Sequence, residues 1–134
     1  MKIQKVLDAF ALLSYLKGER RAAPVVAFLK LAERGRARAL MNEINAGEVF
    51  YILARERSFA EAKMFTDEIL PQLPIELVSN SFEEVVAAAR IKATYAISYA
   101  DAFAVVTGMR EQAPVITGDP DFKRVSKLVK IEWI

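Results

Sequence analysis

Three acidic side chains of this chain stand alone in stretches that are otherwise free of charge. Asp8, Glu48 and Asp101 are each the only charged residue in a run of eleven or more positions, although 27% of the chain is Asp, Glu, Lys or Arg. A lone acid in an apolar run is costly to bury unless something neutralises it. Three such acids suggest one shared cationic partner, and because they are all carboxylates, that partner is best matched by a hard divalent metal.

Each acid also has an ordinary structural interpretation. Asp8 can end a strand or cap the helix that follows it. Glu48 follows Ile44 and precedes Tyr51 at helical spacing, so it points along an apolar stripe, where a salt bridge to Arg55 is its alternative role. These alternatives are reasonable one at a time, but they do not require such clean apolar surroundings.

Asp101 and a further acid, Asp119, also have an ordinary structural interpretation, as residues of helix caps. Ser98 and Asp101 have capping-box spacing, and Asp119 precedes Pro120 as the N-cap of a helix would. Asp121 is expected to be exposed, yet close enough to assist. Clustered carboxylates raise one another's pKa unless a cation lies among them. An oxygen-only site for Mg²⁺ or Mn²⁺ explains the set most economically.

Composition excludes several classes of chemistry. The 134 residues are 54% hydrophobic, which suits one domain with a proper core, and the net charge of +2 neither requires nor excludes a polyanionic partner. The chain has no cysteine and no histidine, so thiol nucleophiles, Ser-His-Asp triads and His-ligated metals are excluded. The N-terminus lacks the features of a signal peptide and no apolar stretch is convincing as a membrane span, so we expect a cytoplasmic protein.

The elements that must position these acids alternate along the chain. Strands are predicted over residues 2–7, 37–41, 75–78, 114–117 and 130–133, the last at a sheet edge. Helices are predicted over residues 9–17, 24–34, 44–57, 58–70, 81–92 and 99–110, with a short one starting at Asp119 and Pro120. The helix over residues 44–57 is apolar almost all round, which predicts that it is buried.

This alternation predicts an α/β fold with a parallel sheet covered on both faces. Ligands of such folds bind outside the carboxyl ends of the strands. Asp8 directly follows the first strand and Asp119 follows the fourth. If these two strands are neighbours, the two carboxylates meet at that edge.

Four segments in this order resemble the PIN-domain family, specifically its VapC-type toxin ribonucleases. VLDAFALLSYL resembles the opening acidic motif and MNEINAGEVFYILARE the second. AAARIKATYAISYADAFAVV resembles the third, and VITGDPDFKRV the closing one. The matching acids are Asp8, Glu48, Asp101 and Asp119, with Asp121 as a candidate outer ligand. Many relatives carry Thr or Ser directly after the first acid, where this chain has Ala9 and Phe10, so a hydroxyl next to Asp8 is missing.

The resemblance implies one PIN domain over residues 1–134, a three-layer α/β/α sandwich around a mainly parallel sheet of four or five strands. It implies that Asp8, Glu48, Asp101 and Asp119 are catalytic and hold Mg²⁺ or Mn²⁺, and that a metal-activated water attacks the RNA phosphodiester. It also implies a homodimer, and inhibition by a VapB-type antitoxin whose C-terminal segment covers the acidic pocket.

RNA contacts are less well marked than the acids. Lys92 and Arg124 are the candidates for substrate binding, although most basic residues of the chain fit solvated helix faces equally well.

Two other functions compete with the ribonuclease. A phospho-accepting receiver domain would need paired acids after the first strand and an Asp after the third, where Ser79 to Ser81 stand. A non-catalytic PIN-like interaction module would not need all four acids.

Overall fold

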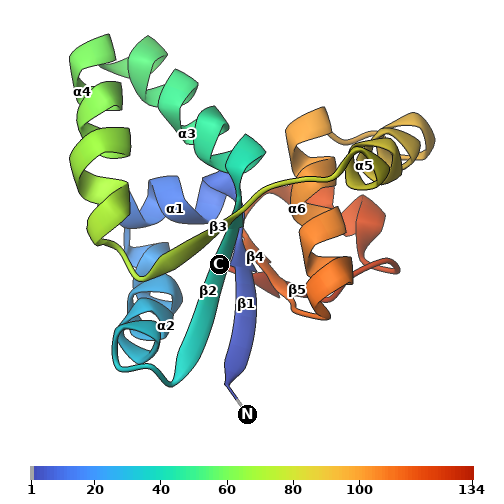
Figure 1. Ribbon diagram of the computed structural model, residues 1–134, viewed down its shortest axis with the longest axis horizontal. Helices are drawn as coiled ribbons and strands as arrows, with labels where there is room; N and C mark the ends of the chain where they lie inside the picture. The colour runs from blue at the N-terminus through green and yellow to red at the C-terminus, as the bar shows by residue number, and fades with distance from the viewer. Residues whose placement is uncertain (1) are drawn as a thin grey trace.

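The structure, a computed structural model, describes residues 2–134 and is built on one parallel sheet (Figure 1). The strand order is β3-β2-β1-β4-β5, and all four strand pairs are parallel. The strands are β1 (Ile3–Leu7), β2 (Ala37–Asn42), β3 (Ile75–Val78), β4 (Val115–Thr117) and β5 (Ile131–Trp133). The predicted α/β fold with a parallel sheet of five strands is confirmed, and β1 and β4 are neighbours.

Helices cover both faces of the sheet, as Figure 1 shows with α1 and α2 to the left and α5 and α6 to the right. The α-helices are α1 (Ala9–Leu16), α2 (Ala23–Glu33), α3 (Glu43–Glu56), α4 (Phe59–Met64), α5 (Phe82–Thr94) and α6 (Tyr99–Glu111). Short helical turns are η1 (Arg20–Ala22), η2 (Phe65–Ile69), η3 (Leu70–Gln72) and η4 (Pro120–Val125). The predicted helix over residues 58–70 therefore begins as α4 and ends as the π-helical turn η2.

Alternation along the strands divides the core between the two faces. Val6, Leu40 and Val115 belong to the apolar cluster around α6, whereas their neighbours Leu7 and Ile116 belong to the cluster under α1 and α2. Successive side chains of a strand point to opposite faces, so strands buried on both sides are continuously apolar. This is the three-layer α/β/α arrangement.

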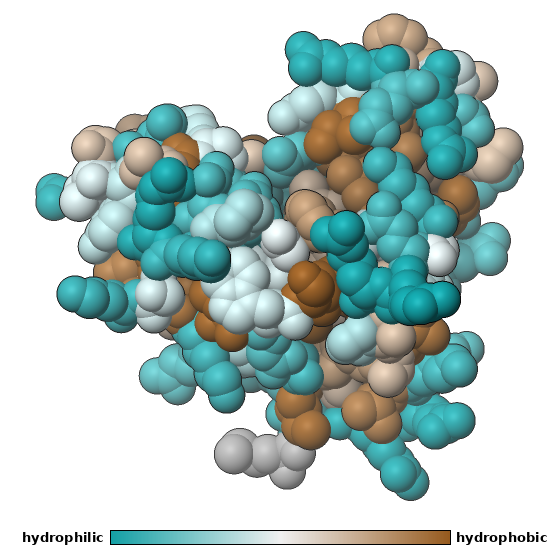
Figure 2. Space-filling model, turned by 180° about the vertical axis from the view of Figure 1, so that it is seen from behind, coloured by the Kyte–Doolittle hydropathy of each residue, from teal (hydrophilic) through white to brown (hydrophobic). Residues whose placement is uncertain are grey.

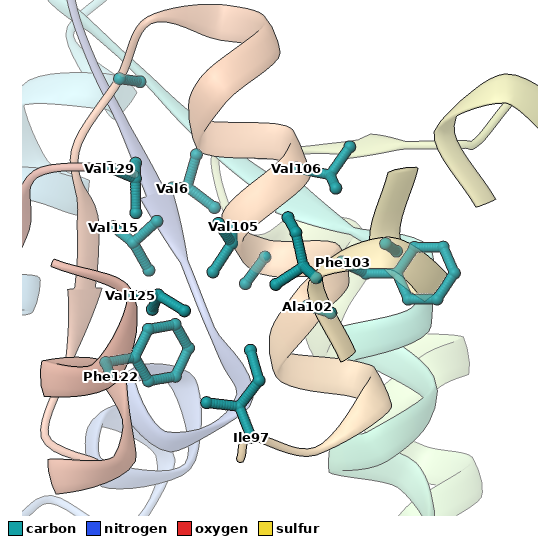
Figure 3. Packing of buried hydrophobic residues seen from close by; sticks show 14 of the residues in the cluster. Val6, Ile97, Ala102, Phe103, Val105, Val106, Val115, Phe122, Val125 and Val129 are labelled. Atoms are coloured by element: carbon teal, nitrogen blue, oxygen red, sulfur yellow. The ribbon is translucent and has the colours of Figure 1, made fainter. Parts of the chain in front are cut away.

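Helix α6 is the most enclosed helix and fixes one wall of the site. All residues from Asp101 to Gly108 are buried. Figure 3 shows Val105 of α6 facing Val6 of β1 and Val115 of β4. No helix within residues 2–134 is long and apolar enough to cross a membrane.

The prediction that the helix over residues 44–57 is buried is wrong. Only one stripe of α3 is buried, consisting of Asn45, Ala46, Val49 and Leu53. Ile44 and Tyr51 remain 42% and 46% exposed. The reason is position, because α3 rises beyond the edge of the sheet and is covered by neighbours on one side only (Figure 1).

Candidate metal centre

The carboxyl ends of β1 and β4 bring the first and last acidic motifs together. Leu7 pairs with Ile116 in the parallel ladder. Asp8 comes directly after β1 and Asp119 two residues after β4, so both lie at the same edge of the sheet. Seen from behind, the molecular surface is notched at this end, between the part built from α3 and α4 and the part built from α5 and α6 (Figure 2).

Asp8 is a helix cap and a buried acid at once. Its Oδ1 accepts a hydrogen bond of 2.8 Å from the amide of Ala11, which caps α1. The residue is 2% exposed, and this burial raises the pKa of its carboxyl to about 8. Hydrogen bonds with Thr117 and Ala11 act against that rise, while the charges of Asp101 and Glu48 add to it. A capping role alone therefore does not explain why a carboxyl is buried at this position among other acids.

Asp101 occupies the first turn of α6 and faces two other carboxylates. The Ser98 hydroxyl caps this helix by accepting a hydrogen bond of 3.0 Å from the Asp101 amide. Burial raises the pKa of the Asp101 carboxyl to about 7, and the charges of Asp119 and Glu48 contribute, while hydrogen bonding with Ser98 opposes them. Like charges that close need a counter-charge to ionise together.

The tightest group joins Asp101 to both acids of the closing motif. Asp101, Asp119 and Asp121 each offer one carboxylate oxygen within 4.8 Å of the others. Asp119 caps η4 by accepting a hydrogen bond of 2.9 Å from the Asp121 amide. Asp121 is half-buried rather than exposed, and it pairs with Arg124 at 2.6 Å. Sequence reasoning placed Asp121 at the margin, whereas the structure places it inside the group.

Glu48 reaches the same end of the sheet from α3. Its Oε1 is buried and has no hydrogen-bond partner. Burial is the main cause that raises the pKa of its carboxyl, followed by the charge of Asp119, while hydrogen bonds with Asn45 and Tyr51 lower it. The alternative salt bridge is not formed, because within the described residues Arg55 lies over the Tyr51 ring at 5.3 Å and does not pair with Glu48.

Two uncharged residues of the site were missed because the search followed charge. Thr117 is buried and its hydroxyl interacts with Asp8, while its Oγ1 accepts a hydrogen bond of 3.0 Å from the Asp119 amide. It supplies a hydroxyl where Ala9 and Phe10 do not. The sequence signal was available, since Thr117 stands just before the Gly-Asp of the closing motif. Asn45 is the second missed residue, and no spacing rule pointed to it.

The two candidate RNA contacts, Arg124 and Lys92, differ in their relation to this group. Arg124 is engaged by Asp121, and its guanidinium is thus committed to the acids. Lys92 is exposed on α5 and makes no ion pair within residues 2–134. Within the described residues, no hydrogen bond or ion pair joins Lys92 to the acids.

The residues present suit a divalent cation. We name Asp8, Glu48, Asp101, Asp119 and Asp121 the acid cluster; they supply only oxygen donors, and Arg124 is the single cationic partner among them in the described part of the chain. Burial and the neighbouring negative charges raise the pKa of two of these carboxyls, to about 8 for Asp8 and about 7 for Asp101. A hard divalent ion would relieve both the repulsion and the unpaired Oε1 of Glu48.

The fold and the acid cluster together define a parallel α/β protein with an acidic centre at the carboxyl edge of its sheet. Residues 5–128 match the family model described as PIN domain, so the chain belongs to the PIN-domain family.

Solved structures share this fold at low sequence identity. One is VapBC2 from Rickettsia felis bound to a promoter DNA fragment, with a TM-score of 0.74, 13% identity, and coverage of 98% of this chain and 99% of the other. DNA-bound VapBC from Salmonella typhimurium matches with a TM-score of 0.72, 13% identity and coverage of 97% of each chain. VapC20 from Mycobacterium tuberculosis is described as a sarcin–ricin loop cleaving toxin. It matches with a TM-score of 0.68, 13% identity, and coverage of 90% of this chain and 94% of the other. A search of curated protein sequences found no match.

Proposed function

We propose that this chain is a Mg²⁺- or Mn²⁺-dependent endoribonuclease, the toxin of a VapBC-type pair, folded as a single PIN domain over residues 1–134. The observation that carries the proposal is the acid cluster, in which buried and half-buried carboxylates from four separate elements lie at one end of the sheet, with Arg124 as their one paired cation in the described residues. Membership of the PIN-domain family and the likeness to VapBC structures support it. A structural neighbour described as cleaving the sarcin–ricin loop supports RNA as the substrate.

In this proposal the acids have distinct tasks. Asp8, Glu48, Asp101 and Asp119 hold the ion, and Asp121 completes the group while Arg124 fixes its orientation at 2.6 Å. When bound, the ion lowers the pKa of a water nucleophile and stabilises the charge that develops on the phosphate. The chain has no histidine, so no imidazole shares the proton transfers. Lys92 remains a candidate for phosphate binding, because its ammonium group is exposed.

Exposed apolar side chains support the proposal that the chain binds protein partners. Phe59 and Phe82 are 75% and 79% exposed, and Met64 is 50% exposed. A groove between α1, α3, α4 and η2 has an apolar floor with charged side chains beside it, and its lining residues are Leu16, Leu53, Met64, Phe65, Ile69, Lys17, Arg57 and Glu61. Surfaces of this kind mark contacts between proteins. We propose that such surfaces serve a VapB-type antitoxin, as the likeness to VapBC complexes supports, and also a second copy of the chain.

Cleavage of a labelled single-stranded RNA, with and without Mn²⁺, tests the enzymatic proposal. The wild-type protein should cut in Mn²⁺ and stop when EDTA is added. Asp101→Asn should lose at least about a hundredfold in rate, because one carboxylate of the tight group is neutralised. Asp67→Asn is the matched control, since Asp67 is exposed and pairs only with Lys63 and Thr66. Cleavage by Asp101→Asn at the wild-type rate would refute the proposal.

A non-catalytic module is the competing result. In that case the folded wild-type protein would not cut any RNA in Mn²⁺, and the acid cluster would serve another purpose. Thermal unfolding of both variants confirms that loss of cleavage does not come from loss of the fold.

A further inference from the structure

Two buried side-chain oxygens within residues 2–134 have no hydrogen-bond partner, and they belong to the same helix. They are Asn45 Oδ1 and Glu48 Oε1, on α3. Residues three apart on a helix lie on the same face, so both face the same neighbours. Buried polar atoms are satisfied in the great majority of cases, so a pair of unsatisfied oxygens next to an acidic group calls for an explanation.

The orientation of the Asn45 amide is fixed by its surroundings. Its Nδ2 donates a hydrogen bond of 2.9 Å to the carbonyl oxygen of Ala100. A backbone carbonyl only accepts hydrogen bonds, so the nitrogen must face Ala100 and the oxygen must face the other way. Asn45 is fully buried, so bulk water does not satisfy this oxygen. The unpaired atom is therefore an acceptor held in place.

The position of Asn45 links two of the acidic motifs. Its bond to Ala100 joins α3, which carries Glu48, to the first turn of α6, directly before Asp101. Its side chain also interacts with the Glu48 carboxylate. Asn45 thus lies between two acids that come from distant parts of the chain.

Asn42 provides an internal comparison, since it is also fully buried and lies one turn earlier. Its Nδ2 donates to Asn80 Oδ1 at 2.7 Å and to Thr107 Oγ1 at 3.0 Å. Its Oδ1 accepts from the Ile44 amide at 2.9 Å and from Asn80 Nδ2 at 3.1 Å. Asn42 is fully used by the fold, whereas Asn45 keeps one acceptor free.

We propose that Asn45 belongs to the cation site, where its Oδ1 accepts a hydrogen bond from the hydration shell of the divalent ion while its Nδ2 positions the first turn of α6. The inference rests on the divalent ion of the proposed function. Mg²⁺ and similar ions keep several of their waters in protein sites, and those waters need acceptors. A neutral amide oxygen supplies one without adding charge to the crowded carboxylates.

Metal binding, measured without RNA, tests this role. Calorimetric titration with Mn²⁺ would compare the wild-type protein with Asn45→Ala and with Asn45→Leu, which keeps the volume of the side chain and removes the acceptor. Loss of such an outer partner costs about 10–100-fold in metal affinity, so both variants should bind Mn²⁺ at least about tenfold more weakly. Asn42→Ala is the control, and it should lower the melting temperature while leaving the Mn²⁺ affinity within about twofold.

The outcomes separate this inference from the proposed function. Wild-type Mn²⁺ affinity in both Asn45 variants would overturn it, even if the wild-type protein cuts RNA. An equal loss in Asn42→Ala would also overturn it, because the effect would then come from packing. A wild-type protein that binds Mn²⁺ through Asn45 but cuts no RNA would overturn the ribonuclease and leave the role of Asn45 intact. A wild-type protein that binds no Mn²⁺ would overturn both.

Discussion

Neutralising Asp8 should make the metal-free protein more stable, although it removes a residue of the proposed active site. Asn has the same shape as Asp and is an equally good N-cap, so Asp8→Asn can still accept the hydrogen bond from Ala11. What it removes is a carboxylate that is 2% exposed and surrounded by other acids. The free energy needed to ionise that carboxyl in the folded state is removed with it.

The magnitude follows from the pKa of Asp8, which burial raises from 3.8 to about 8. Below pH 3.8 the carboxyl is protonated in both the folded and the unfolded chain, so it does not affect the difference between them. Between pH 3.8 and about 8 the unfolded chain releases the proton and the folded chain keeps it. Folding stability therefore falls by about 1.4 kcal/mol per pH unit in this window and levels off above it. At pH 7 the loss amounts to roughly 4 kcal/mol.

Urea unfolding in EDTA at pH 4, 5.5 and 7 measures this effect. The free energy of unfolding of Asp8→Asn should equal that of the wild-type protein near pH 4 and exceed it by several kcal/mol at pH 7. Asp67→Asn, an exposed acid whose pKa is lowered by Lys63, should show no such gain. If Asp8→Asn is no more stable than the wild-type protein at pH 7, or if the difference does not grow with pH, burial does not set the pKa of Asp8.

Two further predictions concern the same end of the molecule. Mn²⁺ affinity should rise with pH, because the carboxyls of Asp8 and Asp101, with pKa values of about 8 and 7, must lose protons before the ion binds. The affinity should rise about tenfold between pH 7 and 8, more steeply below pH 7, and should level off above pH 8. Calorimetric titrations with Mn²⁺ in buffers of different pH measure this rise, and an affinity that does not change with pH would contradict the prediction. Gly118→Ala should destabilise the protein by about 1–3 kcal/mol in urea, because its Cβ would lie 2.2 Å from Cε1 of Phe10. Gly47→Ala, in a helix with nothing within 4 Å of the new Cβ, should stabilise it by about 0.5–1 kcal/mol, and equal effects at the two glycines would contradict the packing argument.

Strand positions were predictable because the strands are apolar runs bounded by clear stop signals. The placement of Asp8 and Asp119 at one edge of the sheet followed from a rule about parallel sheets rather than from any pattern around those residues, and the pairing of Leu7 with Ile116 confirms that β1 and β4 are neighbours. That these acids bind metal stays a prediction.

Other features depended on contacts that no local pattern contains. The exposure of Ile44 and Tyr51 follows from where α3 leaves the sheet, which hydropathy does not encode. Phe10 packs against Gly118 across a sequence distance of more than a hundred residues, and only the close approach of the Phe10 ring to the backbone makes the glycine necessary. Asn45 carries no charge, so a search based on lone carboxylates passed over it.

The central position of β1 has a consequence for the order in which the acid cluster is assembled. On one edge β1 pairs with β2, which follows it by about thirty residues in the sequence. On its other edge β1 pairs with β4, where Val6 is opposite Val115, so this edge is unpaired until β4 has been synthesised. Two members of the tight acidic group, Asp119 and Asp121, follow β4. Chains emerge from the ribosome N-terminus first, so a growing chain holds an open strand edge and an incomplete acid cluster until β4 and η4 have been made. The acid cluster is therefore assembled late in synthesis, after all four strands from β1 to β4 have been made.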